Sequence, residues 1–419
     1  MPPIHVEHVE MSGHIIDSLL FPKVLDAIMT RGARYEIQEF RVGKRQDDPS
    51  YARLEVRADS AEVLEQVLAE IHPHGAVSVH PGNCNAVPAD VPGAFPDGFY
   101  CTTNFRTQVR LGGEWVEVED QEMDCGITLD PEGGAARCVP MIGVKVGDRV
   151  VVGRAGIRVF PVEGGEKKHD LFEFMTSAVS SEKPKAVSVR EIALAMRRTK
   201  AAGEKVLAVL GPAVVHTGGG ELIAGLIRDG LVDVLFAGNA LATHDIEQAF
   251  YGTSLGVSLE KGLPTAEGHE HHLRTINSIR RFGGIRQAVE AGKLTGGIMY
   301  ECITRGVPFV LAGSIRDDGP LPEVITDTIQ AQDAMRRLIP GVGFCLMLAT
   351  TLHSVAVGNL LPAWVRVACI DISPATVTKL MDRGSTQTVG IVSDAEPFLR
   401  ALVHELGKTD TKSAQGDAN

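Results

Sequence analysis

The chain has 419 residues, about three times the usual domain length of roughly 150 residues, so we expect two or three domains rather than one. Its 44% apolar and 22% charged residues are typical of an ordinary globular protein and exclude global disorder or a fibrous repeat. The formal net charge is -12 and the 41 basic residues are scattered, which argues against a nucleic-acid partner.

The cysteines and the N-terminus indicate the cellular compartment. The seven cysteines are odd in number and lack CxxC spacing, which argues against a disulfide framework or a zinc ribbon and fits a reducing compartment. The start, MPPIHVEHVEMSGHIID, lacks the basic and apolar regions of a signal peptide. Residues 341–365 contain no charged residue, but their Thr, His, Ser and Asn residues predict a buried helix beside a ligand rather than a membrane span. We therefore expect a cytoplasmic protein that does not bind membranes.

Residues 1–95 predict a small α+β domain. Helical periodicity runs from residue 14 and ends at Gly32, and two alternating segments, YEIQEFRVG and YARLEVRA, are typical of strands. A second helix is expected in SAEVLEQVLAEIHPHG, with Ser60 as its N-cap. Residues 96–165 then hold short β runs joined by Gly-Gly and Gly-Asp turns, which predict a β-rich unit.

The second half of the chain has a different pattern. The polar residues 166–184 predict a linker, and residues 407–419, with almost no apolar content, predict a disordered tail. Between them, residues 185–406 alternate strand-like and helix-like runs, which is typical of βαβ units. The strand candidates are KVLAVL, VDVLFAG, VPFVLAGS, GFCLMLAT, VRVACIDIS and QTVGIVSD. The predicted fold class is therefore α/β, with a Rossmann-like doubly wound parallel sheet after a small α+β domain and a β-rich unit.

Polar residues gather where the predicted strands end, which is where doubly wound sheets bind ligands. Gly218, Gly219 and Gly220 do not satisfy G-x-G-x-x-G, so they indicate either a close approach to a phosphate or a plain turn before a helix. Asp371 ends an apolar strand, where a carboxylate either binds ribose hydroxyls or caps the next helix, and the ribose role is favoured. Asp394 allows the same two roles, with capping slightly favoured.

Two further polar clusters lie in the α/β region. Arg316, Asp317 and Asp318 follow a buried strand and form either a ligand contact or a surface ion pair. The GHEHH sequence, residues 268–272, offers a metal site, a role facing substrate or cofactor, or structural histidines. It lacks H-x-x-x-H spacing and a partner cluster, so a metal is the least favoured of the three.

The β-rich unit places polar groups in apolar surroundings. They are Asn104, Arg106, Asp124 and Cys125, from CTTNFRT and EMDCG. A cysteine nucleophile needs a nearby base, and the local sequence supplies none, so a buried structural Cys125 is the default interpretation of these residues taken alone.

Over residues 8–406 the chain resembles the archaeal-type ornithine cyclodeaminase family, which also forms the C-terminal half of bifunctional arginine dihydrolase/ornithine cyclodeaminase proteins. Its N-terminal region is similar to the segment shared with lysine-oxoglutarate reductase/saccharopine dehydrogenase. The arginine dihydrolase domain has no counterpart here, so we do not expect arginine hydrolysis. The resemblance rests on HIIDS (14–18), TTNFRT (102–107), EMDC (122–125), FAGNALATHDIE (236–247), GIMYEC (297–302), VLAGSIRDDGPLP (310–322), TLHSVAVGNLLP (351–362), CIDISPATVTKLMDRGS and GIVSD.

The resemblance implies a tightly bound NAD that is recycled while L-ornithine becomes L-proline and ammonia. We expect no metal. The cofactor would be held by loops at the strand ends, with the adenosine ribose on Asp371 and with either Asp317 or Asp318 as a hydrogen-bond partner. The implied cofactor-binding residues are Asn239, Ala240, Asp318, Thr350, Thr351, Leu352, His353, Asp371, Asp394 and Ala395.

The groups that handle substrate and protons are a hypothesis of their own. We assign catalysis to Asp124, Cys125 and His269, and substrate binding to Asn104 and His272, on the expectation that they meet in a cleft between domains. Two other functions stay open. One is a net NAD-dependent dehydrogenase of the lysine or saccharopine type, and the other is a non-catalytic NAD-binding regulatory protein. We expect a homo-oligomer acting on a small-molecule substrate.

Overall fold

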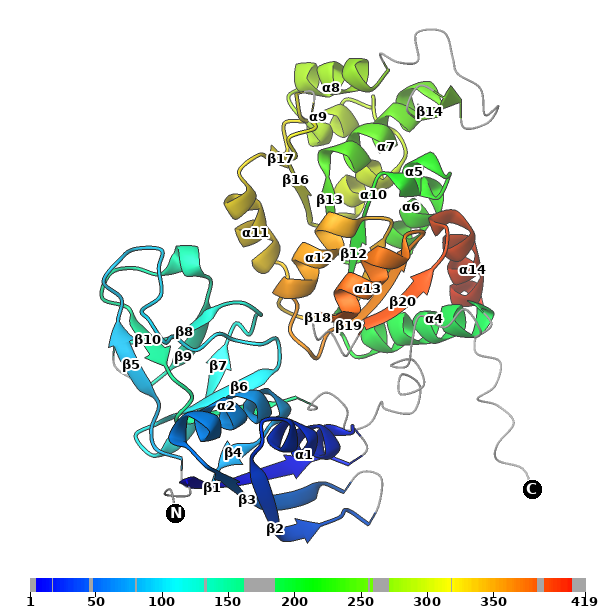
Figure 1. The fold of residues 1–419 in the computed structure, drawn as a ribbon. Helices are drawn as coiled ribbons and strands as arrows, with labels where there is room; N and C mark the ends of the chain where they lie inside the picture. The colour runs from blue at the N-terminus through cyan, green and yellow to red at the C-terminus, as the bar shows by residue number, and fades with distance from the viewer. Residues whose placement is uncertain are drawn as a thin grey trace, which may run out of the picture. The chain divides into compact units, whose positions relative to one another are not determined.

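The computed structural model describes residues 5–16, 18–44, 48–79, 81–131, 134–161, 185–254, 257–258, 271–317, 319–382 and 388–408. The chain divides into two compact units (Figure 1). Unit 1 is Met1–His169 together with Asn359–Trp364, and unit 2 is Asp170–Gly358 together with Val365–Asn419. Unit 1 is therefore built from two separate stretches of the chain.

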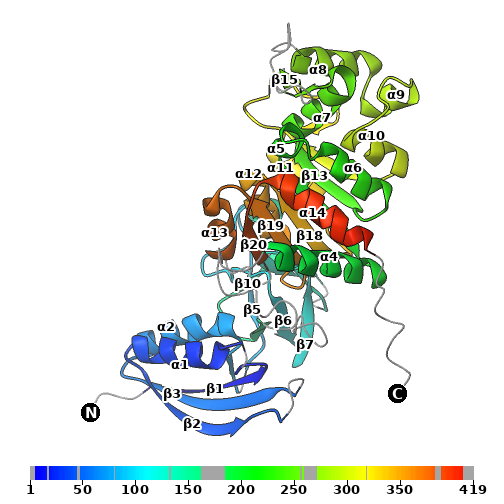
Figure 2. The same ribbon diagram turned by 90° about the vertical axis from the view of Figure 1, so that its right-hand side faces the viewer.

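The first part of unit 1 is a four-stranded sheet, in the order β2-β3-β1-β4, with two helices on one face (Figure 2). The predicted N-cap is confirmed, because the Ser60 hydroxyl accepts a hydrogen bond from the Val63 N–H at 3.2 Å. Strand β1 was not predicted, since only Val9 and Met11 among its residues are buried and no long apolar alternation marks it. The elements are β1 (His5–Gly13), α1 (Leu20–Thr30), β2 (Arg34–Arg41), β3 (Ser50–Ala58), α2 (Ala61–Ile71), η1 (His72–His74) and β4 (Val77–Ser78).

The second part of unit 1 is a seven-stranded sheet in the order β11-β6-β7-β9-β8-β10-β5. Gly112 and Gly113, with φ of 56° and 92°, form the tight turn between β6 and β7 that the Gly-Gly pair predicts. Strand β5 precedes residue 96, where the sequence places the start of the β-rich unit. The elements are β5 (Asn85–Pro88), β6 (Arg106–Leu111), β7 (Glu114–Glu119), β8 (Gly126–Leu129), β9 (Ala136–Val139), η2 (Met141–Gly143), β10 (Arg149–Val152) and β11 (Ile157–Phe160).

Unit 2 contains a seven-stranded parallel sheet in the order β17-β16-β13-β12-β18-β19-β20, which confirms the predicted doubly wound fold. Its strands are all-apolar because helices cover both faces, with α12 and α13 on one side and α4, α6 and α14 on the other (Figures 1 and 2). The strands are β12 (Lys205–Leu210), β13 (Val234–Gly238), β16 (Phe309–Ala312), β17 (Val324–Ile325), β18 (Val342–Leu348), β19 (Arg366–Asp371) and β20 (Thr388–Val392).

The helices of unit 2 follow these strands in chain order. A two-stranded ribbon, β14 (Thr253–Ser254) with β15 (Val257–Ser258), comes after α7. The helices are α4 (Lys185–Ala201), α5 (Ala213–His216), α6 (Gly220–Arg228), α7 (Asn239–Tyr251), α8 (His271–Phe282), α9 (Ile285–Glu290), α10 (Ile298–Arg305), α11 (Thr328–Arg336), α12 (Thr351–Leu360), α13 (Pro374–Asp382) and α14 (Ala395–Gly407).

The uncharged stretch 341–365 is not a single helix as predicted, because its first half forms the central strand β18 and helix α12 follows only after a short turn. Seven free thiols account for every cysteine of the chain. In the part of the chain that the structure describes, no helix is long and apolar enough to cross a bilayer.

The strand order of the parallel sheet reverses between β12 and β18. From β12 the chain proceeds through β13 to β16 on one side, and from β18 through β19 to β20 on the other. At this point the Gly211 N–H donates to the Leu348 carbonyl at 2.9 Å, and a Cβ on Gly211 would stand 1.9 Å from the Ala349 carbonyl oxygen. Only glycine therefore fits at position 211.

We predict that Gly211→Ala lowers the free energy of unfolding by about 1 to 3 kcal/mol, because the new methyl group collides with main-chain atoms that cannot rotate away. Gly225→Ala is the matched control, since Gly225 lies inside α6 with nothing within 4 Å of its Cβ position. In a helix interior this change is expected to stabilise by about 0.5 to 1 kcal/mol. Urea unfolding of both variants tests this, and equal stability of the two would contradict it.

A second prediction concerns His72, which is buried in unit 1 with its ring edge-on to Tyr100. Burial, and to a lesser extent the charge of Arg154, lowers the pKa of His72 to about 4 from 6.5. Between these values the unfolded chain binds a proton that the folded chain excludes, so stability falls as pH decreases from about 6.5 to about 4, by about 3 kcal/mol in total. His72→Asn should flatten this part of the stability curve, whereas the exposed His404→Asn should leave it unchanged. Urea unfolding at a series of pH values measures both, and an unaltered slope in His72→Asn would refute the assignment.

Candidate functional site

The carboxyl ends of the parallel strands define the candidate site of unit 2. Where the strand order reverses, the loops after β12 and β18 run to opposite faces of the sheet, which is the position at which doubly wound folds bind ligands. Helices α7, α12 and α14 begin at this edge, directly after β13, β18 and β20. The first N–H groups of a helix have no partner within it, so this edge favours an anionic ligand.

Asn239 fixes the corner between β13 and α7. Its side chain is 5% exposed, and its Oδ1 accepts hydrogen bonds from the Leu321 N–H at 3.0 Å and from the Thr243 hydroxyl at 3.4 Å. The loop after β16 is thereby tied to the start of α7. Ala240 is the second residue of that helix and is half-buried.

The corner between β18 and α12 holds the four predicted residues Thr350 to His353. Leu352 is 79% exposed, although it is a large apolar side chain. His353 is half-buried, and its Cε1 lies 3.1 Å from where a Cβ on Gly238 would stand, so the imidazole reaches the end of β13. Burial lowers the pKa of His353. The Thr351 hydroxyl is 2.6 Å from the Thr376 hydroxyl on α13.

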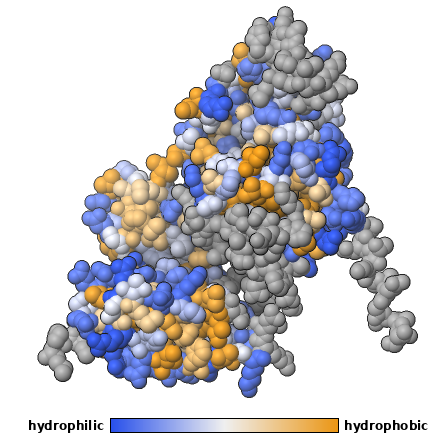
Figure 3. Space-filling view, turned by 45° about the vertical axis from the view of Figure 1, so that its right-hand side comes forward, coloured by the Kyte–Doolittle hydropathy of each residue, from blue (hydrophilic) through white to orange (hydrophobic). Residues whose placement is uncertain are grey.

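Asp371 ends β19 and is 7% exposed. Its Oδ1 accepts a hydrogen bond from the Ser373 N–H at 2.8 Å and closes the turn into α13. Asp371 therefore has part of the helix-capping role that the sequence analysis considered. Its Oδ2 has no hydrogen-bond partner among the described residues. Ile372 beside it is 73% exposed. On the face of the molecule that Figure 3 shows, hydrophobic and hydrophilic residues are interspersed. The free Asp371 oxygen can accept a hydrogen bond from a ribose hydroxyl, and the exposed Ile372 can pack against the flat ring that the ribose carries.

Asp394 occupies the N-cap position of α14, but its side chain makes no capping hydrogen bond. The sequence slightly favoured a capping role for Asp394, and this prediction is wrong. Its carboxylate is exposed and can contact a ligand. Ala395, the first residue of α14, is buried.

Two other loops at this edge have structural contacts. The Asp317 carboxylate accepts from the Ser314 N–H at 2.8 Å and holds the turn after β16, whereas Asp318 lies outside the described residues. In the Gly-rich loop, Gly218 has φ of 86°, and a Cβ on Gly219 would stand 2.9 Å from Leu399 and 3.0 Å from the Val214 carbonyl. The plain-turn interpretation of this loop accounts for both glycines.

In unit 1 the predicted residues Asn104, Asp124 and Cys125 meet around Thr102. The Asp124 N–H donates to the Thr102 carbonyl at 3.1 Å, and the Cys125 N–H donates to the Thr102 hydroxyl at 3.0 Å. Cys125 is buried at 2% exposure, while Asp124 is exposed and has a left-handed φ of 61°. Asn104 is 1% exposed, yet neither atom of its amide has a hydrogen-bond partner. A buried side-chain amide seldom lacks hydrogen-bond partners, so this corner is a candidate site for a ligand.

The segment Asn359–Trp364 completes that corner of unit 1. The Ala363 N–H donates to the Asn104 carbonyl at 2.8 Å, and the Met123 N–H donates to the Asn359 carbonyl at 3.2 Å. The Asn359 side chain donates to the Asp124 carboxylate at 3.4 Å.

A histidine cluster in unit 2 contains residues that sequence reasoning missed. Of the GHEHH sequence, His269 and Glu270 lie outside the described residues, and His271 and His272 begin α8. They adjoin His244 and Glu247 of α7, which hydrogen-bond to each other at 2.8 Å. The available signal was their i, i+3 spacing within FAGNALATHDIE, which puts an acid and an imidazole on one face of a helix.

Asp245, between these two residues, has a structural role on another face of α7. Its carboxylate is fully enclosed and accepts from the N–H groups of Ile298 and Met299, both at 2.8 Å, at the start of α10. Burial raises the pKa of Asp245 to about 7, although the two N–H donors oppose the shift. This contact ties α7 to α10.

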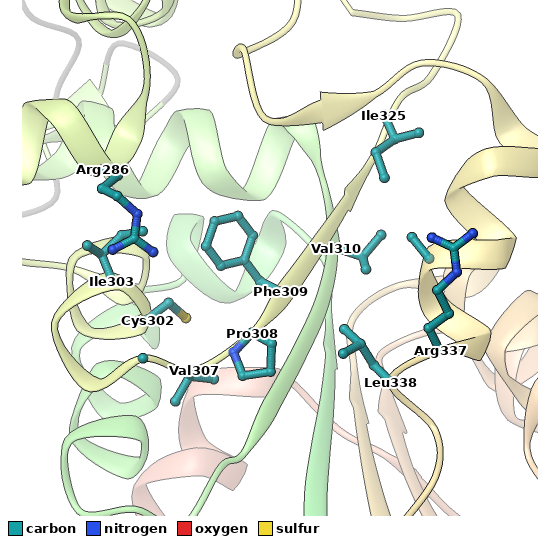
Figure 4. Close-up of a pocket in the computed structure, with 12 residues that line it drawn as sticks. Arg286, Cys302, Ile303, Val307, Pro308, Phe309, Val310, Ile325, Arg337 and Leu338 are labelled. Carbon is teal, nitrogen blue, oxygen red and sulfur yellow. The ribbon is translucent and has the colours of Figure 1, made fainter.

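A cavity of about 520 Å³ lies elsewhere in unit 2, along the outer edge of β16 (Figure 4). Arg286 and Arg337 stand on its opposite sides, with apolar side chains that include Phe309 and Val310 between them. Its lining comes from α9, α10, α11, β16, β17 and the residues next to them, and not from the loops that follow β12, β13, β18, β19 and β20, so it is separate from the candidate site.

Comparison with known proteins extends this description. Residues 190–402 match the family described as "Arginine dihydrolase ArgZ-like, C-terminal, Rossmann fold", residues 106–189 match its C-terminal first region, and residues 6–105 match the "LOR/SDH bifunctional enzyme conserved region". The ornithine cyclodeaminase of Methanopyrus kandleri is 54% identical over 400 residues, which cover 96% of this chain and 97% of that protein.

Solved structures agree with these matches. The apo crystal structure of ArgZ, an arginine dihydrolase from the ornithine-ammonia cycle in cyanobacteria, is 39% identical with a TM-score of 0.82, covering 97% of this chain and 59% of that chain. The ternary complex of AgrE with ornithine and NAD+ is 41% identical with a TM-score of 0.52, covering 96% and 57%. The chain therefore belongs to the ArgZ-like C-terminal family, together with archaeal proteins named ornithine cyclodeaminase.

Proposed function

We propose that this protein is an ornithine cyclodeaminase that converts L-ornithine to L-proline and ammonia with a tightly bound, recycled NAD. The observation that carries the proposal is the carboxyl end of β19, where Asp371 keeps one carboxylate oxygen unpaired beside exposed apolar surface at the reversal of a doubly wound sheet. The relative of the same length named ornithine cyclodeaminase, and the AgrE complex with ornithine and NAD+, support the choice of substrate and cofactor.

The residues at this edge fit a dinucleotide. Asp371 would accept from ribose hydroxyls, and the exposed Ile372 and Leu352 would lie against the cofactor's flat or apolar parts. The free N–H groups at the starts of α7, α12 and α14 would face phosphate oxygens. The contacts we propose are Asn239, Ala240, Asp318, Thr350, Thr351, Leu352, His353, Asp371, Asp394 and Ala395.

A bound NAD supplies a reversible acceptor for hydride, which makes the amine-bearing carbon of an amino acid open to attack without net oxidation. The chain itself must then hold the two amino groups of ornithine within reach of each other, exclude water and move protons between nitrogen atoms. We propose that Asn104 of unit 1 and His272 of unit 2 bind substrate, and that Asp124 and Cys125 of unit 1 and His269 of unit 2 act in catalysis. The unpaired amide of Asn104 is the observation that favours its role.

Two other functions use the same loops. A dehydrogenase of the lysine or saccharopine type would release NADH in proportion to substrate consumed. A regulatory protein would bind NAD and ornithine without turnover. The match of residues 6–105 to the LOR/SDH conserved region is the one observation that favours the dehydrogenase.

The deciding experiment measures three products at once. The denatured supernatant of the purified protein is assayed for NAD, and the native protein is incubated with L-ornithine while proline, ammonia and NADH are followed. We expect co-purified NAD, and proline and ammonia in equal amounts without accumulating NADH, because the hydride returns to the ring. Accumulating NADH would replace the proposal with the dehydrogenase, and bound NAD without product would replace it with the regulatory protein.

A further prediction concerns the cofactor site alone. Asp371→Asn should weaken NAD binding about 10- to 100-fold, since a hydrogen bond to a charged group contributes about 1.5 to 3 kcal/mol. Asp229→Asn, at the exposed C-terminal end of α6, is the control and should bind NAD as the unaltered protein does. Isothermal calorimetry on protein freed of nucleotide measures both, and equal dissociation constants would remove Asp371 from the site.

A further inference from the structure

An acid and an imidazole are held together on the inner face of helix α7. We propose that His244, oriented by Glu247, is a further group that exchanges protons with the amino groups of the substrate. The inference rests on the proposed function and adds to it a catalytic residue, His244, and a positioning residue, Glu247.

The Glu247 carboxylate is fully buried and held on both oxygens. Its Oε2 is 2.8 Å from the Nδ1 of His244, and its Oε1 accepts from the Thr253 hydroxyl at 2.9 Å. Thr253 is in turn 2.8 Å from the Nδ1 of His271. A buried carboxylate is costly unless it is paired, so the fold retains this one in a defined position.

The other ring nitrogen of His244 is available. With Nδ1 hydrogen-bonded to a carboxylate, the neutral ring keeps its proton on Nδ1 and presents a lone pair at Nε2. Nε2 has no hydrogen-bond partner among the described residues. A free Nε2 opposite a carboxylate-bound Nδ1 is the arrangement of a general base.

Two further imidazoles lie near His244. The His216 ring lies edge-on at 4.6 Å between centroids, with its Nδ1 2.6 Å from the Ser254 hydroxyl, and His272 lies at 6.5 Å. Burial, followed by the neighbouring His244, lowers the pKa of His216 to about 4, so its ring is neutral near pH 7. Among the described residues, the titratable side chains that lie against His244 are His216 of α5, Glu247 of α7 and His272 of α8.

The cluster belongs to the edge of the sheet where the cofactor contacts lie. His216 ends α5, which follows β12, and His244 is in the second turn of α7, which follows β13. Asn239, a proposed cofactor contact, begins the same helix. A substrate whose reacting carbon faces the cofactor at this edge would therefore have its nitrogen atoms on the side of α5 and α7.

The chemical step is a proton transfer. An N–H bond of a substrate ammonium group breaks, its electron pair stays on nitrogen, and an N–H bond forms at His244 Nε2. The resulting imidazolium is balanced by the carboxylate of Glu247, so no new net charge is left buried. The amino group that leaves must gain a proton to depart as ammonia, and the His244 imidazolium can return this proton to it.

The test uses the full-length protein with its bound cofactor. His244→Asn should lower kcat for proline formation about 100-fold or more with little change in KM, and should abolish the acid limb of the pH profile. Glu247→Gln should lower kcat less and move the acid limb to lower pH, because the neutral amide no longer stabilises the imidazolium. Glu247→Asp should restore the limb toward its original position. His404→Asn, near the C-terminal end of α14, and Glu65→Gln, on helix α2 of unit 1, are exposed matched controls that should leave the profile unchanged.

A second readout does not depend on turnover. In protein with ¹⁵N-labelled histidine, L-ornithine should shift the imidazole resonance that His244→Asn removes, and Glu247→Gln should change its tautomer signature. Near-normal kcat with an intact acid limb in a folded His244→Asn protein would overturn the inference while the proposed function stands. If the unaltered protein makes no proline, the proposed function fails. If ornithine also does not shift the His244 imidazole resonance, the inference fails as well.

Discussion

The close contact between Gly211 and Ala349 is the constraint on which the second unit depends. The main chains after β12 and β18 can lie side by side only because residue 211 has no side chain. This contact sits where the strand order reverses, so it brings together loops that come from both halves of the sheet. His353 then reaches Gly238 across the end of β12, and Asn239 holds the loop after β16. A single steric requirement thus organises the polar loops into one site.

Helix α7 divides structural and chemical tasks between its faces. Asp245 and Glu247 are both buried carboxylates, but residues two apart point to different sides of a helix. Asp245 receives two N–H groups of α10 and anchors the packing of helices, while Glu247 receives a hydroxyl and an imidazole. The helix is rigid because one face is bound to the core, and a rigid helix keeps an acid and an imidazole in fixed geometry on the other.

The sequence was sufficient for those parts of the fold that local patterns determine. Apolar runs identified six strands of the parallel sheet, and Ser60 identified the start of α2, because burial on both faces and N-capping leave direct traces in composition. Strand β1 left none, since only Val9 and Met11 of its residues are buried. The role of Asp394 and the partners of Glu247 were equally hidden, because they depend on which groups tertiary packing brings near, such as Thr253 or His216.

The second stretch of unit 1 has a consequence for biosynthesis. Asn359–Trp364 supply main-chain partners to Asn104 and Met123, but a ribosome makes them only after most of unit 2. At roughly 5 to 20 residues per second, the nascent first unit waits about 10 to 40 s for its last strip of chain. During that interval the carbonyl of Asn104 has no protein partner. The corner that holds Asn104 and Asp124 therefore matures last, and a fragment ending at residue 169 would carry it unfinished.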